Sequence, residues 1–270
     1  MKLQEAKDIK LGSTSASKVM LGDTQVWPKQ DNNHLLYGEV VDKAQPLPTI
    51  TLDDTVNTPI LDTSSNVFYL DTWSNAAPTS ITFNNKENIK TITKLTGLDT
   101  SNVTSMRDML GDCPSLMSLD LSNFNTSKVT DMRWTFGGCP SLKSLDLSNF
   151  NTYKVTDMYG MFNGCSSLTS LDLSNFNTSK LTSVVQMFNG CSSLTSLDLS
   201  NWNTSKVNEM LWMFDNCSSL KDVYITVEAT LNKLTNNLTS QGNKYIPQTA
   251  TIHYNGVDYK WNGRAWTKQQ

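Results

Sequence analysis

Residues 118–122 read Ser-Leu-Asp-Leu-Ser, so polar and apolar side chains alternate over this stretch. The alternation predicts a β-strand with Leu119 and Leu121 on its buried face and the polar residues on its exposed face. Stacked in register, copies of this strand are expected to form a parallel sheet along one side of the molecule. The further copies lie at residues 144–148, 170–174 and 196–200.

The whole segment around each strand repeats with a fixed period of 26 residues. A period between about 20 and 50 residues is typical of a solenoid, in which each unit buries its apolar face against its neighbours. Such a fold offers a long regular surface, which favours binding over catalysis. One cysteine marks each period, and because stacked thiols would point the same way, we expect free buried cysteines rather than disulfides. They are Cys113, Cys139, Cys165, Cys191 and Cys217.

The segment that returns from one strand to the next predicts a short helix. Val129, Met132 and Phe136 fall at i, i+3 and i+7, and Gly137-Gly138 follows as a stop signal. The methionines are therefore assigned to the core rather than to a ligand-binding groove. The predicted fold class is an α+β repeat solenoid, with a parallel sheet, short helices, a β-rich N-terminal cap and a C-terminal β-meander.

The turn after each strand carries an asparagine and an aromatic residue in every copy. The aromatic residues are expected inside the stack, and they are Phe124, Phe150, Phe176 and Trp202. The side-chain amides of the asparagines are expected to bond to backbone groups of the next coil, which would form a ladder of hydrogen bonds. These asparagines are Asn123, Asn149, Asn175 and Asn201.

Composition divides the chain into four segments. Residues 1–30 hold two short strand-like runs and predict a β arm that docks on another surface. Residues 31–88 predict a β-rich cap or small domain, and residues 89–225 hold the repeats. Residues 226–270 predict a helix and a three-stranded meander, because two Asn-Gly pairs separate runs of alternating residues.

The chain carries a net charge of −3, a sequence pI of about 5.4, and lysines and arginines that are scattered singly. No binding to nucleic acid and no membrane insertion are therefore expected. No apolar run approaches the ~20 residues of a membrane-spanning helix, and the first residues lack the apolar core of a signal peptide. No metal site is predicted, because His34 and His253 lie outside the repeats and no C-x₂-C pair occurs.

The polar face of the predicted sheet carries one aspartate per copy, namely Asp120, Asp146, Asp172 and Asp198. Stacking would set these carboxylates about 5 Å apart, a separation that retaining glycoside hydrolases also use. Nothing in the repeat distinguishes an acid from a nucleophile, so no catalytic residue is assigned. The alternatives are Ca²⁺ bound between the coils, a solvated polar face, or a basic or hydroxyl-rich partner. No other cofactor is expected.

The outer face of the predicted helices varies from copy to copy, while the core positions stay constant. Trp134, Tyr159 and Trp212 fall on this face, and exposed aromatic residues are frequent hot spots of binding. These residues are therefore candidates for contact with a partner or with a second copy of the chain. The alternative is partial burial under the flanking segments.

The unit Cys-Ser-Ser-Leu-Thr-Ser-Leu-Asp-Leu-Ser-Asn-Phe-Asn-Thr-Ser-Lys at residues 165–180 resembles the BspA-like leucine-rich-repeat family. The resemblance covers about residues 89–225. It implies an extracellular solenoid that adheres to proteins or host surfaces, and it identifies no catalytic residue.

The N-terminal pattern Gly12-Ser-Thr-x₃-Lys18-Val-x₂-Gly22-Asp-Thr-x-Val26-Trp27 resembles segments of phage tail and fibre proteins. It implies an arm that includes Val26 and Trp27 and docks to other virion proteins, while the repeats face a host cell-surface protein or glycan. We therefore expect a non-enzymatic phage virion-surface protein of a fibre, tail or head decoration, with homo-oligomerisation left open. The alternatives are a secreted BspA-like bacterial adhesin without its export signal and a carbohydrate-active enzyme.

Overall fold

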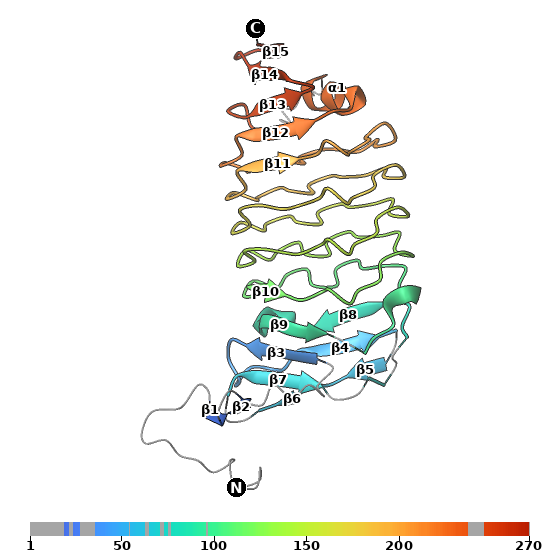
Figure 1. Ribbon diagram of the computed structural model, residues 1–270, viewed down its shortest axis with the longest axis vertical. Coiled ribbons are helices and arrows are strands. Elements are labelled where there is room, and N and C mark those ends of the chain that lie inside the picture. Colours follow the sequence, from blue (N-terminus) through green and yellow to red (C-terminus); the bar gives the residue numbers. More distant parts are fainter. Residues whose placement is uncertain are drawn as a thin grey trace. The chain divides into compact units, whose positions relative to one another are not determined.

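The fold is known from a computed structural model (Figure 1). It describes residues 19–21, 24–27, 36–53, 55–62, 65–70, 73–74, 77–95, 97–236 and 246–269. The chain divides into two units, residues 1–34 and residues 35–270. In the first unit, β1 (Val19–Leu21) and β2 (Thr24–Trp27) pair as an antiparallel hairpin. The predicted docking residues Val26 and Trp27 lie in β2, and their side chains are outside the described part of the structure.

The second unit begins with two small sheets whose strands carry buried apolar side chains. One sheet has the order β10-β9-β3-β7-β6 and the other the order β5-β4-β8. The strands are β3 (Leu36–Val40), β4 (Thr49–Leu52), β5 (Thr55–Asn57), β6 (Ile60–Leu61), β7 (Val67–Leu70), β8 (Ile81–Asn84) and β9 (Ile89–Leu95), with short 3-10 helices η2 (Lys86–Asn88) and η3 (Thr100–Asn102). Strand β9 pairs in parallel with β10 (Ser118–Leu119), so the first sheet leads directly into the repeats.

The repeats form a stack of coils in which residues one period apart lie next to each other (Figure 1). Parallel bridges join Ser105 to Asp131, Asp131 to Asp157, Asp157 to Ser183 and Ser183 to Glu209. On the opposite side, β11 (Ser196–Asp198) pairs in parallel with β12 (Asp222–Ile225). The expected vertical alignment of equivalent residues is therefore confirmed.

The predicted α+β solenoid with short helices is wrong. Among the described residues the only α-helix is α1 (Glu228–Asn236). The other regular elements are mostly β-strands, and the stack of irregular coils does not form a curled or closed solenoid. A continuous parallel sheet was expected along the strand side of the stack. Regular β-strands form there only near the two ends, at β10 and at β11 with β12. We therefore describe residues 97–225 as the coil stack.

Backbone hydrogen bonding explains why the return segments are not helical. The amide groups of Met132, Trp134 and Phe136 donate to carbonyl groups of the next coil, at 3.0, 2.9 and 3.0 Å. An α-helix would need these amides for bonds to the residue four positions earlier in the chain. Trp134 and Gly138 also have positive φ angles of 55° and 74°, which interrupt a right-handed helix. The bonds between coils therefore replace the bonds within a helix.

The core assignments hold even though the helices are absent. Val129, Met132 and Phe136 are fully buried in the irregular coil, as they would be on one face of a helix. The aromatic side chains Phe136, Phe162, Phe188 and Phe214 stack with centroid distances of 5.8, 5.7 and 5.5 Å. The predicted buried position of Phe124, Phe150, Phe176 and Trp202 is confirmed as well.

All five cysteines are free and buried, as expected. Four of the thiols also bond to the preceding coil. For example, Cys165 Sγ donates to Phe136 O at 3.2 Å, and Cys217 Sγ donates to Phe188 O at 2.9 Å. Burial raises the pKa of Cys217 to about 12. Burial raises the pKa of Cys165 and Cys191 as well, so these three thiols remain protonated and act as small apolar groups with one weak hydrogen bond.

Polar side chains in the turns link the coils through two ladders. Asn149 Nδ2 donates to Leu121 O at 2.9 Å and to Phe124 O at 2.8 Å, and Asn175 repeats this arrangement one coil later. The predicted asparagine ladder is therefore present, but the amides are at exposed residues and bond to the preceding coil rather than the next one. A second ladder of buried threonines was not predicted. Thr126 Oγ1 accepts from Asn151 N at 2.7 Å, and its equivalents do the same.

The C-terminal segment forms α1 and a meander that continues the strand side of the stack. Strand β13 (Thr251–Tyr254) pairs in parallel with β12, and β14 (Val257–Trp261) and β15 (Trp266–Lys268) follow in antiparallel order. Asn255 and Gly256 make the first turn with φ angles of 48° and 78°, as expected for an Asn-Gly hairpin. The predicted meander is therefore confirmed at these residues.

His253 links three neighbouring strands at this end. Its Nε2 lies 2.9 Å from Asp222 Oδ1 in β12, and its Nδ1 lies 2.8 Å from Asp258 Oδ1 in β14. Only the imidazolium form can donate from both ring nitrogens. Burial alone would lower the pKa of His253, but the hydrogen bonds that its ring donates to Asp222 and Asp258 outweigh burial and raise the pKa above its ordinary value.

We expect this C-terminal cluster to be more stable at pH 6 than at pH 8.5. A raised folded-state pKa gives stability that is fully present below the unfolded value of about 6.5 and is lost as the pH rises through the folded value. The effect should be on the order of 1 kcal/mol, since the groups are partly exposed. Amide hydrogen exchange of β14 at both pH values measures it. In a His253→Gln variant the difference should disappear, and an equal pH dependence in both proteins would contradict the assignment.

Candidate functional site

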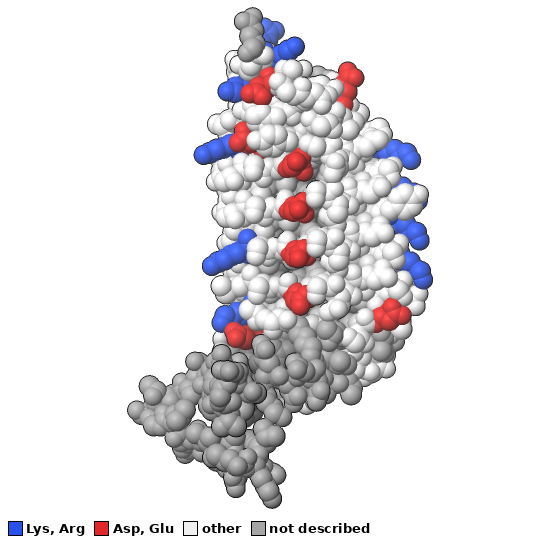
Figure 2. All heavy atoms as spheres, viewed as in Figure 1, with Lys and Arg blue, Asp and Glu red and all other residues white. Residues whose placement is uncertain are grey.

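The predicted file of aspartates lies on one face of the coil stack, where Figure 2 shows a column of acidic side chains. Asp146, Asp172 and Asp198 are exposed, and Asp120 is half-buried. Each carboxylate accepts a hydrogen bond from the backbone amide two residues later, at 2.9 Å from Ser122, Ser148 and Ser174 and at 2.8 Å from Ser200. The file therefore has a structural role in every coil, because it fixes the turn that ends the strand segment.

The turn hydrogen bonds favour the ionised form of Asp146 and Asp172. The backbone hydrogen bond from Ser148 lowers the pKa of Asp146, and the bond from Ser174 does the same for the pKa of Asp172. A general acid would need the opposite shift. In the part of the chain that the structure describes, no group of three or more His, Cys, Asp or Glu side chains could hold a metal ion.

The predicted aromatic residues lie on the opposite, return side of the coils. The rings of Trp134 and Tyr159 contact each other with a centroid distance of 6.0 Å, and Tyr159 Oη lies 3.0 Å from Gln186 Oε1. Trp134 also covers Gly160, where an added Cβ would lie 2.9 Å from Trp134 Cε2. Trp212 is 38% exposed. Trp134, Tyr159 and Gln186 thus form a continuous patch over three coils, and Trp212 lies one coil beyond Gln186.

The backbone at this patch adopts a conformation that side chains disfavour. Trp134, Gln186 and Trp212 have φ angles of 55°, 55° and 54°, and Gly160 occupies the equivalent position with 60°. A non-glycine residue in the left-handed region costs about 1–2 kcal/mol, so glycine is the relaxed choice for this position. Strain of this kind is concentrated at functional sites. Asp108 also has a φ angle of 56° at this position, so the left-handed backbone recurs in every coil and the two tryptophans are accommodated in it.

A charged network borders the aromatic patch. Arg133 Nε lies 2.9 Å from Asp131 Oδ1 and 3.6 Å from Asp157 Oδ2. Burial opposes ionisation of Asp131, yet the hydrogen bonds and charge of Arg133 hold the pKa of Asp131 below its ordinary value. Burial raises the pKa of Asp157. Sequence reasoning missed Asp131 and Asp157 as parts of this surface, although they lie one period apart.

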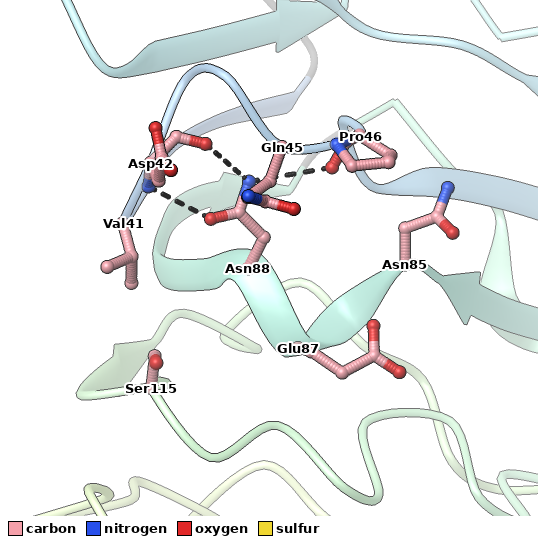
Figure 3. A pocket seen from close by; sticks show the side chains of 8 residues that line it. All are labelled: Val41, Asp42, Gln45, Pro46, Asn85, Glu87, Asn88 and Ser115. Carbon is pink, nitrogen blue, oxygen red and sulfur yellow. Dashed lines mark hydrogen bonds between the residues drawn. The ribbon is translucent and has the colours of Figure 1, made fainter.

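A pocket of about 270 Å³ lies between the N-terminal sheets and the first coil (Figure 3). Its central side chain is Asn88, whose Oδ1 accepts from Asp42 N at 3.0 Å and whose Nδ2 donates to Asp42 O at 2.9 Å. Both ends of the amide therefore hold the loop after β3 in place. The pocket is also smaller than the ~300–1,000 Å³ of typical ligand sites, so we assign it a structural role.

A family model for a Mycoplasma protein of unknown function, DUF285, matches residues 78–171 and 138–240. Together the two overlapping matches cover more than half of the chain. The chain belongs to the DUF285 family. No curated protein and no solved structure matches it.

The DUF285 matches span the coil stack and α1. The family description names no activity. The BspA-like and phage-tail resemblances, the absence of catalysis and the extracellular or virion location therefore stay predictions. Among the helices of the described residues, none has the length and apolar character to span a membrane.

Proposed function

We propose that this DUF285 protein is a non-enzymatic binding protein that adheres to a host surface through the aromatic patch of its coil stack. The observation that carries the proposal is the pair Trp134 and Trp212, which keep large side chains in a backbone conformation where Gly160 is relaxed. Aromatic rings supply much of the energy of binding sites. The bordering Arg133 and Gln186 add hydrogen-bonding groups for a protein or glycan.

The proposed location is the surface of a phage virion, with the N-terminal hairpin as the docking arm. This part rests on the resemblance of the N-terminal pattern to phage tail and fibre segments. The partners would then be other virion proteins at the arm and a host cell-surface protein or glycan at the coils. A mass-spectrometric inventory of purified virions tests the location separately from the binding surface.

We expect a Trp134→Gly/Trp212→Gly variant to bind its target at least about tenfold more weakly, since hot-spot aromatics contribute about 2 kcal/mol or more. Glycine is chosen because Gly160 occupies the same position, so the substitution relieves backbone strain. The measurement is binding of the purified protein to an array of glycans and bacterial cell-surface preparations. Asp108→Gly is the matched control, because it relieves the same kind of φ angle, 56°, at an exposed residue outside the aromatic patch.

The control variant should retain most of the binding. Equal losses in the tryptophan and aspartate variants would contradict a role for the aromatic patch. Failure of the unmodified protein to bind any array component would contradict the proposed adhesion.

A further inference from the structure

A column of lysines runs along the coil stack at a position that the aromatic patch does not include. Lys128, Lys154, Lys180 and Lys206 lie one period apart, and all four are exposed. Figure 2 shows basic side chains along one edge of the coil stack. Neighbouring coils are about 4.8 Å apart, so the column is roughly 14 Å long. Residues scattered singly in the sequence are thus brought together by stacking.

The fold explains the aspartate column but not the lysine column. Each aspartate of the file accepts a backbone hydrogen bond within its own coil. By contrast, Lys128 donates to Asn102 Oδ1 at 2.7 Å, and Lys180 lies 4.2 Å from the centre of the Tyr153 ring. Within the described residues, Lys154 and Lys206 make neither a hydrogen bond nor an ion pair. Like charges are therefore stacked without a structural role that all four copies share.

The surroundings of the column fit a sugar polymer better than a nucleic acid. Exposed asparagine and threonine side chains, such as Asn151, Asn177 and Thr156, lie within three residues of the lysines and offer hydrogen bonds to hydroxyl groups. Single-stranded nucleic acids depend on aromatic platforms. The aromatic side chain next to this column is Tyr153, and the ammonium group of Lys180 already occupies its ring face.

We propose that the lysine column binds a linear acidic polysaccharide that lies along the axis of the coil stack. Sulfate or carboxylate groups of successive sugars would pair with successive ammonium groups, and the attraction would depend on salt because bound counterions are released. Asp99 lies near Lys128 at one end of the column, so the more distant lysines are the stronger contacts. The proposal is independent of the aromatic patch and stands on different residues.

The test compares two variants that remove the same charge. Lys154→Gln/Lys206→Gln removes the two lysines without internal partners, and Lys143→Gln/Lys221→Gln removes two exposed lysines that share another repeat position. The probe is dextran sulfate, with uncharged dextran and single-stranded poly(dT) as further arms. We expect the first variant to bind dextran sulfate about tenfold more weakly and with a shallower salt dependence, because two ionic contacts are lost. The second variant should bind like the unmodified protein.

Isothermal titration at several salt concentrations measures these affinities, and thermal unfolding checks that both variants are folded. Equal losses of affinity for dextran sulfate in the two variants would show that binding depends only on net charge, and would overturn the proposal. Absent binding to dextran sulfate at low salt, or equal binding to uncharged dextran, would also overturn it. Tighter, lysine-dependent binding of poly(dT) would replace the polysaccharide by a nucleic acid.

Discussion

Replacing Phe162 with alanine is expected to lower the free energy of unfolding by about 3–5 kcal/mol. Phe162 is fully buried, and its ring stacks between Phe136 and Phe188 with centroid distances of 5.8 and 5.7 Å. Each coil buries its apolar side chains only against the coils beside it. The substitution therefore opens a cavity at two coil interfaces at once. Urea unfolding followed by circular dichroism and by tryptophan fluorescence measures the loss.

Tyr153→Ala is the matched control for this substitution. Tyr153 lies in the same coil, but its side chain is 49% exposed. Its ring contacts the ammonium group of Lys180 and does not stack with the phenylalanine rings of the core. Exposed substitutions usually change stability by about 0.5 kcal/mol or less. Similar losses for both variants would show that the aromatic stack does not hold the coils together.

The sequence predicted which residues are buried far better than it predicted the backbone. Val129, Met132 and Phe136 are core residues in a helix and equally in the observed coil, because both conformations turn these positions inward. Periodicity therefore identified the core without identifying the element. The irregular coil forms instead of a helix because backbone amide groups, such as that of Trp134, donate to the next coil at 2.9 Å. Hydrogen bonds between neighbouring coils cannot be predicted from the hydrophobic pattern within one repeat.

The candidate sites show the same limit. The aspartate file and the aromatic residues were found from the period, but the turn that holds Asp146 and the strained backbone of Trp134 and Trp212 depend on local geometry. The lysine column illustrates the opposite case. Its members were visible at a spacing of 26 residues, yet a search for basic runs along the chain does not detect charges that only stacking brings together.

Deleting residues 166–191, one full period, is expected to leave a folded protein with a cooperative unfolding transition. The deletion joins Cys165 to Ser192 and thereby restores the Cys-Ser-Ser-Leu sequence of the repeat. Every remaining coil keeps two neighbours with matching core and hydrogen-bonding positions, because contacts extend only to adjacent units. Circular dichroism and urea unfolding measure the outcome.

Deleting residues 166–178, half of this period, is expected to abolish that transition. The shortened chain would place the strand side of one coil against the return side of the next, so the thiol, threonine and phenylalanine ladders would lose their partners in this region. Such unpaired buried groups destabilise by several kcal/mol in sum. A half-period deletion that unfolds as cooperatively as the full-period deletion would contradict register between coils as the source of stability.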